Sequence, residues 1–283
     1  MEPRFERPAS VAQATRLLAA RPWAVLAGGT DLYPAHVGRP ISLPLLDIGG
    51  IAELRGIRRD GDGWTIGATT TWSDVARAEL PPLFSALQAA AREVGGVQIQ
   101  NTGTVAGNLC NASPAADGTP VLLAMAARVV LQSARGVREL AVDEFVLGNR
   151  RTARGDDELV VAARIPARSA RARSAFAKLG GRRYLTIAVT TVAVVVDADA
   201  EGTVSAAGVA VGSCAPAARR LPALEARLVG APVEDDLAAI VADGDLAPLA
   251  PIDDVRGSAA YRIDATRTLV RRALGEVSAS IRR

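Results

Sequence analysis

The spacing of apolar residues predicts a chain of short helices and strands. After Ser10, apolar residues recur at helical spacing, Gln13 completes a capping box, and Pro22 should end that helix. Short apolar runs bounded by glycine or proline indicate strands, and an Asp-Gly-Asp-Gly stretch between two of them indicates a hairpin. These signals predict strands over 23–27, 43–48, 129–132 and 158–165, a hairpin over 54–68, and helices over 71–79 and 82–94.

Residues 97–120 follow neither the helical nor the strand period. They are rich in glycine, asparagine, serine, threonine and proline. A stretch of this length without its own secondary structure is uncommon inside a compact chain, and it is then more often functional than disordered. We therefore expect a functional loop in this region.

The pattern changes after Pro166. A β-branched run over 187–196 predicts a strand buried on both faces, and residues 204–211 form a suitable partner strand. Helices are expected over 221–229, 234–242 and 261–277, the last with an apolar stripe made by Leu269, Val270, Ala273, Leu274 and Val277. We therefore place a domain boundary near residue 172, between a mixed N-terminal part and a small sheet with a helical cluster.

Composition limits the class of protein. The chain has 283 residues, of which 49% are apolar, so it is long enough for about two domains and is not a disordered chain. No apolar run approaches the roughly 18 residues that a membrane span needs. The N-terminus lacks the basic and apolar segments of a secretion signal, so we expect a cytoplasmic protein.

Charge and metal-binding residues exclude further classes. The 33 cationic and 30 acidic side chains are interspersed, so a nucleic-acid groove is not expected. The two cysteines, Cys110 and Cys214, are too few for an iron–sulfur cluster or a cysteine-rich zinc site. With His36 as the lone histidine, no metal site is expected, and His36 itself suits a solvated or capping role.

Lysine usage is unusual, because Lys178 is the only lysine beside 32 arginines. Chance or a surface position would account for it. The other interpretation is a site where a compact ammonium is needed in place of the planar guanidinium of arginine.

Two segments carry candidate chemistry. The first, Ala27-Gly28-Gly29-Thr30-Asp31, follows a predicted strand, and its glycines allow a sharp turn that brings backbone N–H groups close to an anion. An ordinary strand-to-helix turn would have the same composition, and the spacing matches neither a Rossmann fingerprint nor a P-loop.

The second segment, residues 101–117, offers hydroxyls, carboxamides and a carboxylate among small residues. Such a set suits a pyrophosphate and the hydroxyls of a sugar or a ribityl chain. A polar surface loop is the alternative, although Val105, Leu109 and Cys110 indicate a segment that packs inward. Two such segments and a single lysine fit an extended dinucleotide better than a single phosphate.

These motifs resemble the FAD subunit of molybdenum hydroxylases, the group of xanthine dehydrogenase and carbon monoxide dehydrogenase. Ala-Gly-Gly-Thr-Asp-Leu and Thr-Val-Ala-Gly-Asn-Leu-Cys-Asn-Ala-Ser-Pro-Ala-Ala-Asp look like the two flavin-binding motifs of that family. Further matches in the same order lie at residues 145–152, 158–166, 175–178, 208–216 and 254–262. The resemblance therefore covers nearly the whole chain.

The resemblance implies an α+β fold. An FAD-binding domain of the PCMH or vanillyl-alcohol-oxidase type would span 1–172, with subdomains of about 1–55 and 56–172. A C-terminal domain of the carbon monoxide dehydrogenase flavoprotein type, made of three antiparallel strands and a helical bundle, would span 173–283.

The resemblance also implies an electron-transfer subunit. A large subunit with molybdopterin would oxidise the substrate, two [2Fe–2S] clusters on a small subunit would pass the electrons on, and FAD on this chain would deliver them to an acceptor. The assembly would be a dimer of heterotrimers. NAD+, oxygen, a quinone and a carrier protein all remain open as acceptors.

Carried over position by position, the resemblance implies a set of residues that contact FAD. They are Val25, Leu26, Ala27, Gly28, Gly29, Thr30, Asp31, Leu32, Val94, Thr104, Gly107, Asn108, Cys110, Asp117, Val160 and Lys178. Leu32 and Cys110 would flank the isoalloxazine ring. The ammonium of Lys178 would offset negative charge and raise the flavin's reduction potential, and no side chain would be catalytic.

The sequence departs from the family motifs at two positions, and two alternative functions remain open. Ala106 stands where the family usually has a glycine, and Thr186 stands near a position where many members have an acidic residue. Tyr184 suits either a shield over the ring or an ordinary strand start. A stand-alone flavin oxidoreductase of the same fold and a scaffold that has lost its cofactor are the competing functions.

Overall fold

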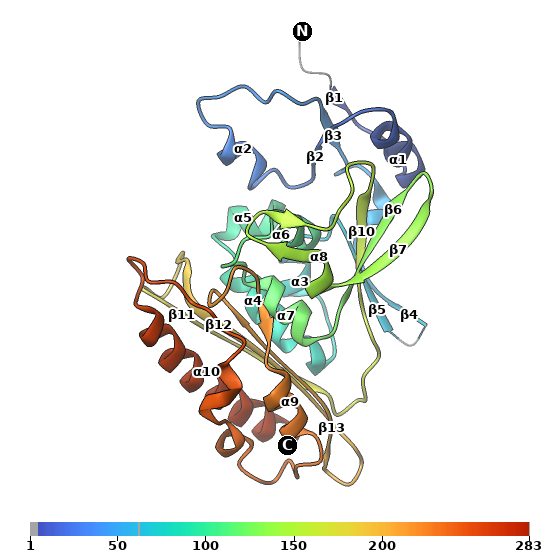
Figure 1. The fold of residues 1–283 in the computed structure, drawn as a ribbon. Helices are drawn as coiled ribbons and strands as arrows, with labels where there is room; N and C mark the ends of the chain where they lie inside the picture. Colours follow the sequence, from blue (N-terminus) through green and yellow to red (C-terminus); the bar gives the residue numbers. More distant parts are fainter. Residues whose placement is uncertain (1–4, 62, 283) are drawn as a thin grey trace.

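A computed structural model describes residues 5–61 and 63–282 and shows three main sheets around a central group of helices (Figure 1). The N-terminal segment forms a small parallel sheet with β3 in the middle. Its strands are β1 (Phe5–Glu6), β2 (Ala24–Leu26) and β3 (Leu45–Asp47).

Helix α1 (Val11–Ala20) confirms the first predicted helix. Ser10 Oγ accepts the N–H of Gln13 at 3.2 Å, as expected for an N-cap. In a capping box, the Gln13 side chain would accept the N–H of Ser10. Here its carboxamide oxygen accepts the N–H of Ala9, the residue before Ser10, at 2.9 Å.

The second sheet is antiparallel, with strands in the order β4-β5-β10-β6-β7. Its strands are β4 (Ile57–Asp60), β5 (Gly63–Gly67), β6 (Arg128–Ser133), β7 (Gly136–Ala141) and β10 (Leu159–Ile165). Asp60 pairs with Gly63, which confirms the predicted hairpin, although Asp62 of its turn lies outside the described residues. Two short strands, β8 (Val146–Gly148) and β9 (Arg151–Thr152), form a separate hairpin.

The central helices include three, within residues 97–124, that sequence reasoning missed. The helical segments between α1 and β8 are α2 (Leu32–Ala35), η1 (Ala52–Leu54), α3 (Trp72–Arg77), η2 (Pro82–Phe84), α4 (Ser85–Glu93), α5 (Val97–Thr102), α6 (Val105–Asn111), α7 (Gly118–Ala124) and α8 (Val142–Phe145). The helices predicted over 71–79 and 82–94 are confirmed, the first with a complete capping box between Thr71 and Asp74.

The prediction that residues 97–120 lack secondary structure is wrong. The segment holds α5, α6 and the start of α7, each only six or seven residues long. Thr104 caps α6 by accepting the N–H of Gly107 at 3.0 Å, and Ala112 ends it with φ at +47°. Helices of two turns give no measurable period, and packing against the core stabilises them.

The C-terminal sheet is antiparallel, in the order β11-β12-β13-β14. Its strands are β11 (Arg173–Gly180), β12 (Ala188–Ala198), β13 (Val204–Gly212) and β14 (Arg219–Arg220). Every residue of β12 is buried, because α10 covers one face of the sheet while α4 and α7 cover the other (Figure 1). The strand predicted to be buried on both faces is confirmed, and β14 adds a short fourth strand to the three expected.

The remaining helical segments are α9 (Pro222–Leu228), η3 (Leu237–Ile240), η4 (Asp243–Leu246) and α10 (Ala259–Ile281). The predicted apolar stripe of α10 is buried, as expected. The α-helix predicted over 234–242 is wrong, since only a 3-10 turn forms there. The Asp236 side chain accepts the N–H of Ala238 at 3.0 Å, a local bond that competes with α-helical hydrogen bonding.

Buried contacts fix the C-terminal sheet to the central helices. Ser174 on β11 accepts the N–H of Ala86 at 2.9 Å and donates to the carbonyl of Leu83 at 2.6 Å. A Cβ on Gly208 of β13 would overlap the carbonyl oxygen of Ala124 at the end of α7. Strand β11, which carries Lys178, is therefore held directly against α4.

We predict that Ser174→Ala lowers the free energy of unfolding by about 2 kcal/mol, because a buried N–H and a buried carbonyl both lose their partner. The matched control is Ser205→Ala on β13, where an exposed serine donates a single hydrogen bond to Asp197. Urea unfolding of the FAD-free chains measures both. Equal, small losses in the two variants would contradict the role given to Ser174.

Candidate cofactor-binding site

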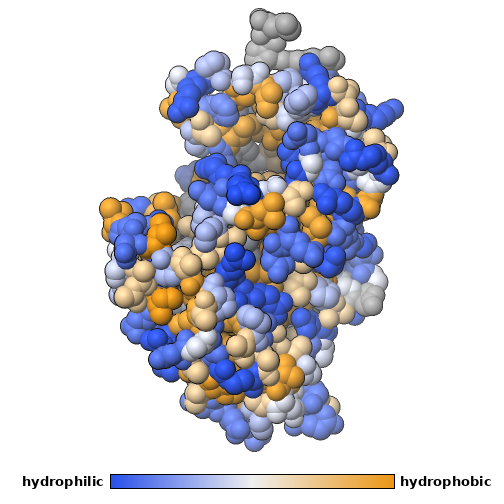
Figure 2. All heavy atoms as spheres, viewed as in Figure 1, coloured by the Kyte–Doolittle hydropathy of each residue, from blue (hydrophilic) through white to orange (hydrophobic). Residues whose placement is uncertain are grey.

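A cavity of about 850 Å³ lies between the loop from β2 to α2, the helices α5 and α6, and the segment over 113–117 that follows α6. The space-filling view shows a hollow below the N-terminal segment, where that segment faces the central helices (Figure 2). Every residue proposed from the sequence to contact FAD lines this cavity except Lys178, which lines a neighbouring cavity. The two glycine-containing segments therefore face one another across a shared space.

Glycine is required where the first loop meets α5. A Cβ on Gly28 would overlap the backbone carbonyl of Thr102, which no side-chain movement could relieve. Gly29 has φ at +70°, a region that favours glycine. Thr30 lies against Gly103, where an added Cβ would be 3.3 Å from Thr30 Oγ1. The loop is therefore packed backbone to backbone against the second motif.

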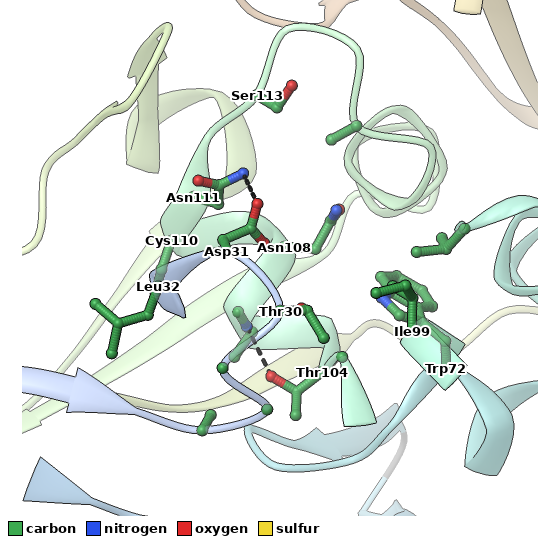
Figure 3. A pocket seen from close by; sticks show the side chains of 18 of the residues that line it. Thr30, Asp31, Leu32, Trp72, Ile99, Thr104, Asn108, Cys110, Asn111 and Ser113 are labelled. Atoms are coloured by element: carbon green, nitrogen blue, oxygen red, sulfur yellow. Dashed lines mark hydrogen bonds between the residues drawn. The ribbon is translucent and has the colours of Figure 1, made fainter. Parts of the chain in front are cut away.

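Helix α6 directs polar side chains toward the cavity (Figure 3). The Oδ1 atoms of Asn108 and of Asp117 are buried and accept no hydrogen bond from the described residues. Buried oxygen atoms normally accept at least one hydrogen bond, so the cavity suits a ligand that carries hydroxyl or N–H donors. FAD carries such donors on its ribityl chain, ribose and rings, and the lining therefore fits it.

A buried ion pair separates the main cavity from a second cavity of about 550 Å³. Lys178 Nζ lies 2.7 Å from Asp117 Oδ2 and 3.3 Å from the carbonyl oxygen of Glu93. Both charged side chains are more than nine-tenths buried. Asp117 lines the main cavity and Lys178 lines the second one, so the only lysine of the chain is buried and not a surface residue.

Burial raises the pKa of Asp117 to about 6, even though the ammonium of Lys178 opposes the shift. The reason is that the carboxylate loses more hydration than its single cationic partner restores. Asp117 therefore changes charge close to neutral pH, next to the cavity.

Sequence reasoning missed several lining residues. Asn111 Nδ2 donates to Asp31 Oδ1 at 2.9 Å, and Arg150 Nη1 donates to Asn111 Oδ1 at 3.0 Å (Figure 3 shows the first bond). Arg154 and Glu158 also line the cavity. Asn111 and Arg150 both lie inside stretches that match the family motifs, so those stretches could have identified them.

The loop between β11 and β12 contributes an edge of the cavity. Leu185, Thr186 and Ile187 line it, whereas Tyr184 is 64% exposed and lines neither of the two cavities described above. His36 follows the last residue of α2, and its Nδ1 is 2.8 Å from the carbonyl oxygen of Leu32, the first residue of that helix, which agrees with a capping histidine.

The described residues show neither a metal-binding cluster nor a membrane-spanning helix. Residues 5–61 and 63–282 contain no group of three or more histidine, cysteine or acidic side chains placed to hold a metal ion. Within the same ranges, no helix has the length and apolar character needed to cross a membrane.

Comparison with known proteins gives two family matches in tandem. Residues 1–168 match the FAD binding domain in molybdopterin dehydrogenase, and residues 174–277 match the CO dehydrogenase flavoprotein C-terminal domain.

Relatives match over nearly their full length. The carbon monoxide dehydrogenase medium chain of Hydrogenophaga pseudoflava is 33% identical over 96% of both chains. The xanthine dehydrogenase FAD-binding subunit of Escherichia coli O157:H7 is 31% identical over 98% of this chain and 96% of its own. The solved carbon monoxide dehydrogenase of Hydrogenophaga pseudoflava that lacks the Mo-pyranopterin moiety superposes with a TM-score of 0.87 at 32% identity, over 99% of this chain and 98% of that one.

The family matches and the relatives cover the same cavity-forming segments that the sequence motifs identified. The chain therefore belongs to the family of FAD-binding subunits of molybdenum hydroxylases, which are oxidoreductases.

Proposed function

We propose that this chain holds FAD along the shared cavity and serves as the electron-transfer subunit of a molybdenum hydroxylase complex. The observation that carries the proposal is the joint lining of one cavity by both glycine-containing segments. FAD, when bound, would supply redox chemistry that can exchange electrons singly or in pairs. The chain's own residues would bind, orient and electrically tune the cofactor.

The assignment of individual residues follows the geometry of the cavity. Residues 25–32 would line the pyrophosphate and flavin, while Thr104, Gly107 and Asn108 would contact the phosphates and adjacent groups. Asp117 would accept a hydrogen bond from a cofactor hydroxyl through its unpaired Oδ1. The unpaired oxygen atoms argue against a scaffold that has lost its cofactor, since such a chain would have no use for buried acceptors without partners.

Lys178 would tune the flavin through its charge. Its ammonium is buried beside the cavity, where low polarity strengthens electrostatic effects. A positive charge near the cofactor stabilises the electron-rich reduced state, so Lys178 would raise the reduction potential. Val94 and Val160 supply apolar contacts on the cavity wall.

We further propose the partners that this role requires. A small subunit with two [2Fe–2S] clusters would supply electrons, and a large molybdopterin subunit would oxidise the substrate, within a dimer of heterotrimers. NAD+ is the first acceptor to test. The two free thiols, Cys110 and Cys214, suit a reducing compartment and support a cytoplasmic location.

We also propose a domain boundary at residue 172, with an FAD-binding domain over 1–172 and a C-terminal domain over 173–283. The two family matches meet between residues 168 and 174, which supports this division. It falls in the segment between β10 and β11.

The complex purified from its source tests the function. We expect a flavin absorbance band near 450 nm, about the free-flavin value, and co-purification with a cysteine-rich small subunit and a larger one. Stopped-flow reoxidation of the reduced complex with NAD+, oxygen, a quinone or a carrier protein would then identify the acceptor. A yellow chain that turns over a substrate without partners would favour the stand-alone oxidoreductase, and a colourless chain that refuses FAD would favour the scaffold.

We predict that Gly28→Ala raises the FAD dissociation constant about 5- to 150-fold, since displacing the backbone from Thr102 costs on the order of 1–3 kcal/mol. Gly275→Ala on α10 is the control, because a Cβ there meets open space. Titration of the FAD-free chains with FAD, followed by flavin fluorescence, measures both. Unchanged affinity in Gly28→Ala would show that the loop contact does not shape the site.

We predict that the ionisation of Asp117 makes the FAD-free chain less stable as pH rises from 4 to 7. The folded-state pKa, about 6, exceeds the ordinary value of 3.8, so the folded chain binds the proton more tightly and that stabilisation is lost as pH rises through 6. The difference in unfolding free energy between the parent and Asp117→Asn should therefore fall by up to about 3 kcal/mol across this range.

Asp254→Asn provides the control for that measurement. Hydrogen bonds from Arg256 and Arg262 hold the pKa of Asp254 below its usual range, so its difference curve should stay nearly flat between pH 5 and 7. A flat curve for Asp117→Asn as well would contradict a raised pKa at the cavity wall.

A further inference from the structure

The first loop brings a carboxylate into the cavity of an anionic cofactor. Asp31 lines the cavity, and its side chain is exposed. FAD carries a diphosphate, and a bound dinucleotide would displace water that screens the carboxylate. Like charges in one cavity repel more strongly as water leaves, so Asp31 would oppose binding unless a cation offsets it.

A hydrogen-bonded chain links Asp31 to such a cation. Asn111 Nδ2 donates to Asp31 Oδ1 at 2.9 Å, and Asn111 Oδ1 accepts from Arg150 Nη1 at 3.0 Å. Figure 3 shows the Asn111 side chain from the end of α6 pointing at Asp31 on the first loop. Partial burial raises the pKa of Asp31, and the positive charge of Arg150 opposes that shift.

The backbone holds Arg150 in place. Arg150 lies between β8 and β9 with φ at +53°, and its N–H donates at 3.0 Å to the carbonyl of Ala112. Ala112, which itself has φ at +47°, follows Asn111 directly. Two non-glycine residues in the left-handed region therefore join the hairpin to the end of α6, and such backbone persists only where surrounding structure enforces it.

We infer that Arg150, acting through Asn111, is a positioning residue that offsets the charge of Asp31 and keeps the first loop in place against FAD. The inference rests on the placement of FAD in this cavity proposed above. Asn111 sets the geometry, because its amide donates to the carboxylate while its carbonyl accepts from the guanidinium. Arg150, linked through Asn111 of the second segment, thus extends the site to a third segment of the chain, the β8–β9 hairpin.

A double-mutant cycle on FAD affinity tests the inference. The full-length FAD-free chain is titrated with FAD at low ionic strength, as Arg150→Gln, Asp31→Asn and the double variant. Arg150→Gln keeps a donor for Asn111 and removes the charge. We expect it to weaken FAD binding about three- to tenfold when Asp31 is present and less than about twofold when residue 31 is asparagine.

Two further variants separate charge from structure. Arg150→Lys keeps the charge and should retain most of the affinity, whereas Arg150→Gln should approach the parent as salt is raised, because screening weakens the charge effect. The matched control is Arg151→Gln, an exposed arginine on the same hairpin that does not line the main cavity. It should bind FAD like the parent at every salt concentration.

Several results would overturn the inference. An equal loss from Arg150→Gln in both residue-31 backgrounds would show that Arg150 does not act on Asp31, and no loss at all would remove it from the site. If Arg150→Gln lowers the melting temperature, Arg150→Lys carries the test, and a loss equal to that of Arg150→Gln would then refute the charge effect. A parent chain that binds no FAD would instead refute the proposed function.

Discussion

The architecture of the site depends on one close approach between two backbones. Gly28 lies so near the carbonyl of Thr102 that any side chain would separate them. Because of this contact, the loop after β2 and the helices after Gly95 enclose a single cavity, although they come from different parts of the sequence. The buried acceptors of Asn108 and Asp117 then lie beside this cavity, where a ligand can serve as their hydrogen-bond partner.

The C-terminal region also contributes to the proposed cofactor site. Lys178 on β11 forms the buried ion pair with Asp117, and Ser174 on the same strand holds β11 against the start of α4. The N–H of Ser213, just past β13, donates to the carbonyl of Pro114 in the second motif. The two regions matched by separate families therefore build one site, and the sole lysine of the chain lies where they meet.

Sequence reasoning succeeded where a physical signal is local and long. The capped helix after Ser10, the β-branched strand β12 and the apolar stripe of α10 each extend over ten residues or more of regular pattern. It failed over 97–120, because α5 and α6 are too short to show a period and depend on packing. It failed again over 234–242, where the Asp236 side chain stabilises a tighter turn.

The same division holds for the site. Glycine-rich composition and family resemblance identified the lining residues of both loops. Arg150 and Asn111 lie inside matched motifs, but the role proposed for them was not predicted, because it depends on a three-way contact between a hairpin tip, a helix end and a loop that appears only in the folded chain. The ion pair between Lys178 and Asp117 could not be predicted from the sequence either, because the two residues meet only when β11 packs against the central helices.

Hydrogen–deuterium exchange of backbone amides, with and without FAD, tests the central claim most directly. If both segments close on one cofactor, FAD should slow exchange in residues 26–31 and in residues 104–117 together, and leave the middle of α10 unchanged. Protection confined to one of the two segments, or absent from both while FAD is bound, would contradict a site built on the approach of Gly28 to Thr102.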